Sequence, residues 1–382
     1  MNCSDKIILI VCTLAIVYAS NQYTSVQQLE FENEELYYYM DVFVGTPPQK
    51  QRLVFDTGSS SIEFTCDGCN ECGDHDFPNF KSSESKTFSS SAILSKNFNI
   101  NFMEGSSYEC KVSADFISIG NNKKLSNFGC VTKETGNLKS QRANGVMGFS
   151  MVDNGLRSVS TFKNFKLLKS GFAFCLNKNS SWLTLDSNSF NYLNDSTTWQ
   201  IDCKHNDWSE FYRIPLQEIK VGVLHSNLSS LTPNGKSGVV LDSGFSYVSF
   251  TDQIYNSIIS NLEDEVMRNG SFRKLINHFT IISNCLQAKF DYSTIKTIMK
   301  LFPTIYFEIN KDTVIPWFPF EYLVVITNGD LTNGICFNFQ KGLNNMFGNV
   351  WMNNKIISLD LKNKIVDITN SECSKIEFNS SN

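Results

Sequence analysis

Histidine is scarce in this sequence, and its scarcity limits the chemistry that the chain can perform. Four histidines occur among 382 residues, at positions 75, 205, 225 and 278. A serine or cysteine hydrolase needs a histidine beside its nucleophile, and the chain contains no Gly-x-Ser-x-Gly motif. The sequence therefore gives no support to that class of enzyme.

Clusters of basic residues are also missing. The formal net charge is −5, and no block rich in Lys or Arg interrupts the chain. Nucleic acids and anionic membranes both attract basic patches. We therefore expect neither as a partner.

Long apolar runs are absent after the first twenty residues, so no stable membrane span is expected. The start has the form of a secretory signal peptide over residues 1–19, in which Lys6 precedes the apolar run Ile7 to Val17. Small residues at Val17 and Ala19 predict cleavage after Ala19. A retained signal anchor is the alternative, but the run is short for crossing a bilayer.

Cysteine usage fits an oxidising compartment. Removal of the signal would leave ten of the twelve cysteines, an even number that favours disulfides. Asn-x-Ser glycosylation motifs support secretion weakly, at Asn179, Asn194, Asn227, Asn269 and Asn379. The expected location is outside the cell or in the lumen of the secretory pathway, with the endoplasmic reticulum and an acidic vacuole both open.

One cysteine cluster has the spacing of zinc ligands. Cys66, Cys69, Cys72 and His75 follow one another at intervals of three residues. In a secreted chain with an even number of cysteines, disulfides are the favoured interpretation. We therefore expect no metal and no organic cofactor.

An Asp-Thr/Ser-Gly motif occurs twice, about half a chain apart, and each copy ends an apolar run. The copies lie in Leu53 to Ser60 and in Val239 to Ser246, with aspartates Asp56 and Asp242. The repetition predicts a duplicated lobe that gives one carboxylate to a shared cleft. Two facing carboxylates cannot both ionise cheaply, so they share a proton and can activate a water.

The remaining pattern predicts a mostly-β protein of two similar lobes with few helices. Helices are expected at Asp252 to Met267, where apolar residues recur every fourth position, and at Tyr292 to Leu301. The expected units are a short acidic segment (20–36), an N-terminal lobe (37–195), a C-terminal lobe (196–376) and a polar tail (377–382). Residues 187–198 are the expected crossing between the lobes.

The run Tyr38 to Gln49, followed by Val54 to Ser60, closely resembles the pepsin-like aspartic proteases, and the resemblance extends from about Leu36 to Cys373. The cysteine layout is most similar to the nepenthesin, secretory-pathway plasmepsin and β-secretase types. The resemblance implies a bilobal pepsin-like fold, peptide hydrolysis and an extended peptide or protein substrate. A monomer is the default expectation for the oligomeric state. It also implies that strands ending in Val146-Met147-Gly148 and Met346-Phe347-Gly348 cross the aspartate loops.

Several residue roles follow from the same resemblance. Asp56 and Asp242 would be catalytic, Thr57 and Ser243 would brace the two loops, and Ser59 would hydrogen-bond Asp56. The glycine that ends each motif would permit a tight turn, and the resemblance also implies a flap with its tip around Phe102, Gly105 and Ser106. The remaining substrate-binding and support residues are Gly58, Gly244, Phe245 and Ser246. The implied disulfides are Cys285–Cys336, Cys175–Cys373 and Cys66–Cys130, whereas Cys69, Cys72, Cys110 and Cys203 cannot be paired from sequence.

The chain departs from the family pattern near the expected site. Phe245 replaces a hydroxyl residue beside Asp242, which predicts a raised pKa for Asp242 unless Ser246 compensates. Phe102 replaces the flap tyrosine, and Glu63 replaces the tryptophan that this tyrosine bonds. Residues 20–49 contain no Lys or Arg, so we expect no basic propeptide. These departures leave one alternative open, a catalytically inactive pepsin-fold binding or inhibitor protein.

Overall fold

The structure is a computed structural model. It describes residues 26–32, 36–90, 97–151, 159–165, 171–185, 190–192, 197–204, 206, 208, 211–226, 238–275, 281–282, 284–286, 292–328, 332–374 and 376–378. The expected signal peptide and three of the glycosylation motifs, at Asn194, Asn227 and Asn379, lie outside these residues. So do His205 and His278.

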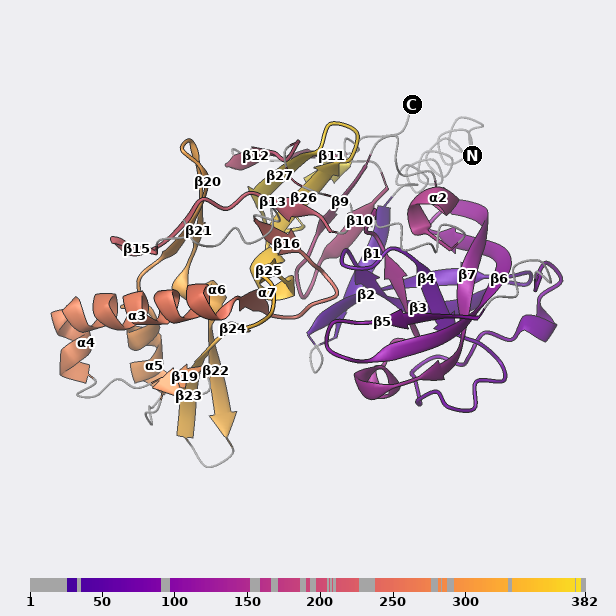
Figure 1. Cartoon of the computed structure of the whole chain (residues 1–382), viewed down its shortest axis with the longest axis horizontal. Coiled ribbons are helices and arrows are strands. Elements are labelled where there is room, and N and C mark those ends of the chain that lie inside the picture. Colours follow the sequence, from indigo (N-terminus) through magenta and orange to yellow (C-terminus); the bar gives the residue numbers. More distant parts are fainter. Residues whose placement is uncertain are drawn as a thin grey trace, which may run out of the picture.

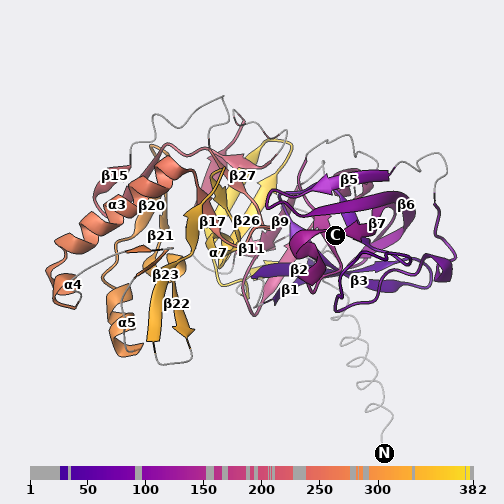
Figure 2. The ribbon, with the colours of Figure 1, turned by 60° about the horizontal axis from the view of Figure 1, so that its bottom comes forward.

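The chain forms two lobes joined by a layer of strands, as Figures 1 and 2 show. One lobe contains β2 to β8, and the other contains α3 to α5 with the surrounding strands. Strands β9, β10, β26 and β27 lie between the lobes. The expectation of a mostly-β, two-lobed architecture is confirmed.

The first lobe is built on a sheet of thirteen strands in the order β12-β27-β26-β9-β10-β1-β2-β3-β8-β4-β7-β6-β5. Its strands from the first half of the chain are β1 (Val26–Glu32), β2 (Tyr37–Val44), β3 (Gln49–Asp56), β4 (Ile62–Thr65), β5 (Asn97–Asn101), β6 (Ser107–Ile119), β7 (Asn122–Glu134), β8 (Gly145–Gly148), β9 (Phe172–Cys175) and β10 (Ser181–Thr184). Short helices η1 (Ser82–Glu84), η2 (Gly136–Ser140) and α2 (Thr161–Phe165) connect them.

The second half of the chain completes this sheet and builds the other lobe. Its strands are β11 (Phe190–Tyr192), β12 (Thr198–Asp202), β13 (Arg213–Ile214), β14 (Glu218–Val221), β15 (Leu224–Ser226), β16 (Val239–Leu241), β17 (Val248–Phe250), β18 (Ile281–Ile282), β19 (Cys285–Leu286), β20 (Ile305–Asn310), β21 (Thr313–Trp317), β22 (Leu323–Asn328), β23 (Thr332–Phe337), β24 (Phe339–Lys341), β25 (Met346–Phe347), β26 (Lys355–Asp360), β27 (Ile365–Asn370) and β28 (Ile376–Phe378). Its helices are α3 (Asp252–Arg268), α4 (Gly270–Leu275), α5 (Tyr292–Met299), α6 (Pro319–Tyr322) and α7 (Asn349–Met352).

Both helices expected from sequence are present. Helix α3 buries Ile254, Ile258, Leu262 and Val266, the residues of the predicted apolar face. This face packs against β14, β15, β17 and β24 of the second lobe. The amphipathic pattern of this helix therefore reflects the burial of one helix face in the core of the second lobe.

Three strands lie where no strand was expected. Strand β1 falls in the predicted acidic segment and pairs with β2 and β10. Strand β11 lies within the expected crossing and pairs with β28, whose last two residues belong to the expected polar tail. The sheets therefore extend further at the joints between the lobes than the sequence pattern predicts.

Four disulfides fix the fold. The structure joins Cys66 to Cys130, Cys175 to Cys373 and Cys285 to Cys336, which are the pairs that the resemblance implies. It also joins Cys69 to Cys72. Cys110 and Cys203 are buried thiols outside any disulfide.

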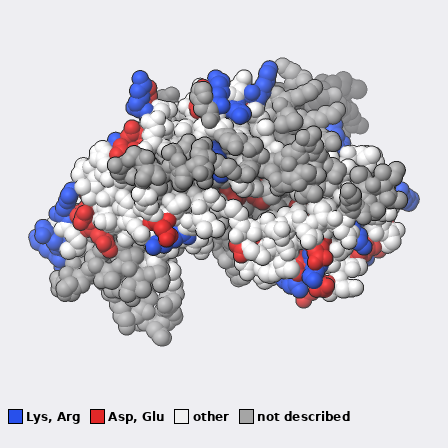
Figure 3. Space-filling model, viewed as in Figure 1, with Lys and Arg blue, Asp and Glu red and all other residues white. Residues whose placement is uncertain are grey.

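Charged side chains of both signs are interspersed over the face seen in Figure 3. Large areas of this face carry no charge. Among the described residues, we find no helix with the length and apolar character that crossing a membrane requires.

Candidate active site

Parallel strand pairs place the two Asp-Thr/Ser-Gly loops. Strand β3 ends at Asp56 and runs parallel to β8, with Asp56 opposite Gly148. Strand β16 ends just before Asp242 and runs parallel to β25, with Leu241 opposite Phe347. Each aspartate thus leaves a buried strand at the same point of a repeated unit, as the duplicated motif predicts.

Reciprocal hydrogen bonds lock the two loops together. The backbone N–H of Thr57 donates to Ser243 Oγ at 2.9 Å, and the N–H of Ser243 donates to Thr57 Oγ1 at the same distance. The hydroxyls in turn donate to the carbonyls of Leu241 at 3.0 Å and Phe55 at 2.8 Å. These four bonds are buried, so they hold the two aspartates in a fixed relation.

The glycines of the motifs lie against the opposite carboxylates. A Cβ added to Gly58 would lie 2.5 Å from Asp242 Oδ2, and one added to Gly244 would overlap the carboxylate of Asp56. Neither glycine has a positive φ. The tight turn expected from sequence is therefore not what requires glycine here, because the requirement is close approach across the lobes.

The two carboxyl groups face each other and titrate together. Burial raises the pKa of Asp242 well above its ordinary value, and the charge of Asp56 raises it further. Burial also raises the pKa of Asp56, although the nearby polar groups of Ser59, the Gly58 N–H and Asp242 partly offset this. The Gly58 N–H donates to Asp56 Oδ1 at 2.7 Å. Both pKa values are raised, more strongly for Asp242, so the pair as a whole holds a proton.

The neighbours of the dyad differ from the family pattern as expected. Phe245 offers Asp242 a backbone N–H and no hydroxyl, and the raised pKa of Asp242 agrees in direction with the sequence-based expectation. Its main causes, however, are burial and Asp56. Ser59 influences the pKa of Asp56, but its buried hydroxyl makes no hydrogen bond of ordinary geometry. The backbone carbonyl of Ser246 accepts a hydrogen bond from the N–H of Val350.

Tyr212 is a support that the sequence analysis missed. Its buried hydroxyl donates to the carbonyl of Phe149 at 2.5 Å, and the Phe149 N–H donates to the carbonyl of Asp56 at 2.6 Å. The backbone carbonyl of Tyr212 accepts a hydrogen bond from the N–H of Leu241. One residue from the second lobe thus supports both loops, and no local pattern around this tyrosine signals such a role.

The hairpin β5–β6 carries the residues expected at the tip of the flap. At its tip, the Phe102 N–H donates to the Ser106 carbonyl at 2.9 Å, and Gly105 adopts a φ of +98° that favours glycine. Ser106 is buried and bonds Glu104. The Phe102 ring packs edge-on against Tyr108, with centroids 5.4 Å apart, and Asn344 of the second lobe contacts Met103. The flap therefore reaches from one lobe to the other.

Disulfides and the pairing of His75 with Glu134 hold the cysteine-rich loop in place. Cys66, Cys69 and Cys72 are all in disulfides, so none is a thiolate that could bind zinc. His75 lies 3.1 Å from the buried carboxylate of Glu134 and 2.7 Å from the carbonyl of Gln141. Burial lowers the pKa of His75, but these two partners outweigh that effect and raise it overall.

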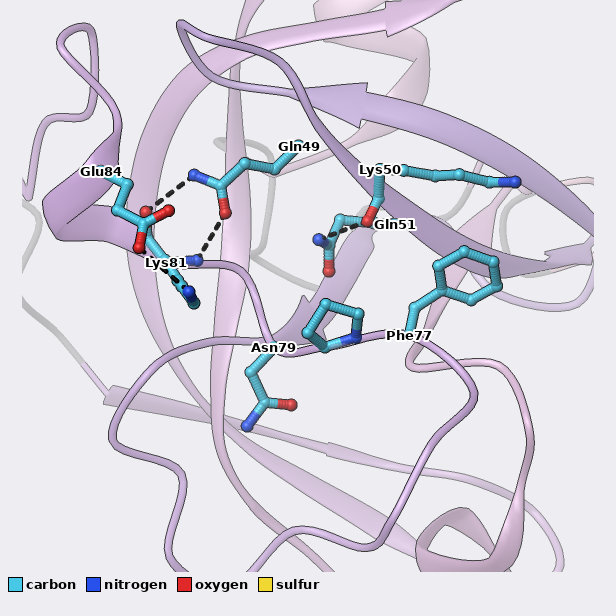
Figure 4. Close-up of a pocket in the computed structure, with 8 residues that line it drawn as sticks. Gln49, Lys50, Gln51, Phe77, Asn79, Lys81 and Glu84 are labelled. Carbon is cyan, nitrogen blue, oxygen red and sulfur yellow. Dashed lines mark hydrogen bonds and ion pairs between the residues drawn. The ribbon is translucent and has the colours of Figure 1, made fainter.

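A separate pocket lies at the far end of β3. It has a volume of about 260 Å³ and is lined by Gln49, Lys50, Gln51, Phe77, Pro78, Asn79, Lys81 and Glu84 (Figure 4). The amide of Gln49 makes two hydrogen bonds with the backbone of Lys81 across it. Seven residues of strand separate Gln49 from Asp56, roughly 23 Å, so this pocket belongs to a different part of the lobe.

Comparison with known proteins agrees with this geometry. A sequence model described as "Eukaryotic aspartyl protease" matches residues 37–371. Plasmepsin V of Plasmodium falciparum is 24% identical over 436 aligned residues, covering 89% of this chain and 71% of the relative. Aspartic proteinase nepenthesin-1 of Nepenthes gracilis is 24% identical, covering 88% and 78%. Aspartic protease 5 of Toxoplasma gondii is 30% identical over a shorter region, covering 30% of this chain and 15% of that protein. This chain belongs to the eukaryotic aspartyl protease family.

Proposed function

We propose that this protein is an aspartic endopeptidase in which Asp56 and Asp242 activate a water between them. The observation that carries the proposal is the mutual approach of the two loops. Each glycine faces the carboxylate of the other lobe, and four buried hydrogen bonds hold this arrangement. Such a preorganised pair is suited to acid–base chemistry and serves no evident structural purpose.

The two aspartates would take different roles. Asp56, the more acidic group, would accept a proton from the water as general base. Asp242 would keep its proton to polarise the scissile carbonyl. Transfer of protons within the pair would then supply the leaving amine, so no cofactor would be needed.

The substrate would be an extended polypeptide bound under the flap. The backbone of such a peptide can pair as an additional strand, which gives affinity without a fixed sequence. The flap contributes Gly105, where no side chain blocks the approach, and the apolar ring of Phe102. Plasmepsin V and nepenthesin-1, similar over most of their length, support a peptidase.

The proposed location is outside the cell or in the lumen of the secretory pathway. Four disulfides, two of them joining residues more than 60 positions apart, are typical of proteins that fold in an oxidising compartment. The apolar N-terminal run supports the same location. Cleavage after Ala19 and glycosylation at Asn179 and Asn269 are proposals of the same kind.

The test is cleavage of a quenched peptide library from acid to neutral pH. We expect the wild-type protein to cleave and Asp56→Asn to lose at least 1,000-fold in kcat/KM, within the range for removing a general base. Asp312→Asn, in an exposed turn, is the matched control and should cleave like the wild type. Circular dichroism of all three proteins checks that they are folded.

Full activity in the Asp56→Asn variant would contradict the proposed mechanism. A folded wild-type protein that cleaves no peptide at any pH would favour the alternative of an inactive binding or inhibitor protein. The replacement of hydroxyl residues by Phe245 and Phe102 is the observation behind that alternative.

A further inference from the structure

A buried carboxyl group that the proposed mechanism does not use lies beside the dyad. Glu63 is on β4, and its side chain is 0% exposed. In the sheet it belongs to a lateral row in which Val54 lies opposite Val146, Val146 opposite Glu63, and Glu63 opposite Gly129. Val54 is two residues before Asp56 and points to the same face of β3. The row therefore carries one acid among apolar and small residues, in the same sheet as Asp56 and separated from β3 by β8.

The space around Glu63 is shaped by the flap strands. A Cβ added to Gly129 would lie 2.9 Å from the ring of Phe98, 3.0 Å from Glu63 Cγ and 3.1 Å from Cys110 Sγ. Phe98 is on β5 and Cys110 is on β6, so both strands of the flap contact this space. Glycine at position 129 is what makes room for the acid beneath the flap.

Glu63 has no partner for a negative charge. Neither carboxyl oxygen makes a hydrogen bond of ordinary geometry, and the described residues include no Lys, Arg or His in an ion pair with it. The titratable groups that interact with it are Asp56 on β3 and Tyr108 and Cys110 on β6. Glu134 on β7 acts on Tyr108 and Cys110 and is itself paired with His75.

A charge in this place is therefore costly. Burial raises the pKa of Glu63 to about 8, and the charge of Asp56 acts in the same direction, whereas the Ser61 hydroxyl opposes it. Burial likewise keeps Tyr108 and Cys110 neutral. Glu63 is consequently a neutral acid under acidic conditions and becomes charged only near the alkaline end of the physiological range.

The contacts lead from Glu63 to the flap tip. Cys110 and Tyr108 belong to one apolar cluster with Val54 and Val146, and Phe98 and Phe102 pack against this cluster. Phe102 stacks edge-on against Tyr108. An ionised Glu63 would draw water into this cluster, because a buried charge without a partner is unstable. The first elements to move would be the flap strands that cover it.

We propose that Glu63 is a positioning residue: its neutral carboxyl group keeps the base of the flap packed beside Asp56, and its ionisation releases the flap. The predicted effect of Glu63 on peptide hydrolysis rests on the proposed function. The predicted release of the flap does not depend on it. Ionisation of Glu63 would then set an upper pH limit for activity that is separate from the titration of the dyad.

Hydrogen exchange of the full chain at pH 5 and pH 8.5, corrected for intrinsic exchange rates, tests the release. In the wild-type protein we expect protection of residues 97–119 to fall at least tenfold between the two conditions. In Glu63→Gln, which stays neutral, protection should change less than twofold. The hairpin β22–β23 of the other lobe is the internal control and should behave alike in both proteins.

The pH dependence of kcat/KM gives a second measurement. We expect the alkaline limb of Glu63→Gln to lie at least one pH unit above that of the wild type, with the acid limb unchanged. Glu63→Met, apolar and of similar size, replaces Glu63→Gln if the latter does not fold. Equal flap protection in wild type and variant at both pH values would overturn the proposal. Release of the flap in a protein without activity would support it while refuting the proposed function.

Discussion

The two lobes carry the same strand arrangement around their aspartates, but they fill one equivalent position differently. Glu63 lies seven residues after Asp56, and Ser249 lies seven residues after Asp242. Each occupies the third place of a row across its sheet: Val54, Val146, Glu63 and Gly129 in one lobe, and Val240, Met346, Ser249 and Gln340 in the other.

The polar groups at this position are satisfied in one lobe and not in the other. Ser249 Oγ donates to the carbonyl of Asn344 at 2.8 Å, and it is 2% exposed. Glu63 is just as buried and has no such partner. The comparison shows that the duplicated frame tolerates a polar residue here. It also shows that the residue at this position can become charged only in the lobe with the flap.

The largest expected effect tests what the lobes share. Gly58→Ala and Gly244→Ala each place a methyl group against the opposite carboxylate, and we expect each to lower kcat/KM about 100-fold, as misplacement by about 1 Å does. Peptide cleavage at the optimum pH is the measurement. Gly270→Ala is the control, since a Cβ there meets nothing within 4 Å, and it should retain full activity.

A strong loss in one glycine variant and none in the other would show that the lobes are not equivalent at the dyad. Loss of activity together with loss of folding would point to a structural role of the glycine. Thermal unfolding of each variant distinguishes these cases.

The second prediction separates Glu63 from Ser249 by the pH dependence of stability. Because the pKa of Glu63 is raised in the folded state from 4.5 to about 8, the folded protein holds a proton that the unfolded chain has released. Its stabilising contribution is complete below about pH 4.5 and is lost as the pH rises to about 8. Glu63→Gln should remove roughly 2–5 kcal/mol of this pH dependence.

Ser249→Ala should instead cost about 1 kcal/mol at every pH, because it removes a neutral hydrogen bond. Urea unfolding at pH 4.5, 6 and 8 compares the two variants with the wild type, which has the same dyad. Parallel stability curves for the wild type and Glu63→Gln would contradict the assignment of a raised pKa to Glu63.

The smallest expected effect makes the two loops more alike. Phe245→Thr adds a hydroxyl beside Asp242, which favours the charged carboxylate and lowers the pKa of Asp242. Since Asp242 must stay protonated, the alkaline limb of activity in a Glu63→Gln background, where Glu63 no longer limits it, should move to lower pH by about one unit. Phe245→Leu removes the ring without adding a donor, and its limb should stay in place. An unchanged profile for both variants would mean that Phe245 has no influence on the dyad.

The sequence predicted the parts of the molecule that depend on local pattern. The repeated Asp motif and the apolar face of α3 both follow from residues close together in the chain. The strands that cross the aspartate loops were expected from a resemblance, and the structure pairs them as expected.

The features that sequence reasoning missed depend on contacts between distant segments. Strand β1 was expected only as an acidic segment. The partners of its acidic residues lie far away in the sequence, as Arg142 does for Glu32 at 2.8 Å, so the local pattern does not show them. Tyr212 carried no signal because its role depends on Phe149, 63 residues earlier. Glu63 was noted as a departure from the family, but its burial without a partner is a property of the folded sheet.

The joint between the lobes has a consequence for how the chain can be divided. Strand β9 pairs with β26, and Cys175 is bonded to Cys373, 198 residues later. A chain that stops at the crossing would leave β9 with a bare edge on the side where β26 belongs, and such edges invite association with other chains. We therefore expect that neither half of the chain folds as a separate unit.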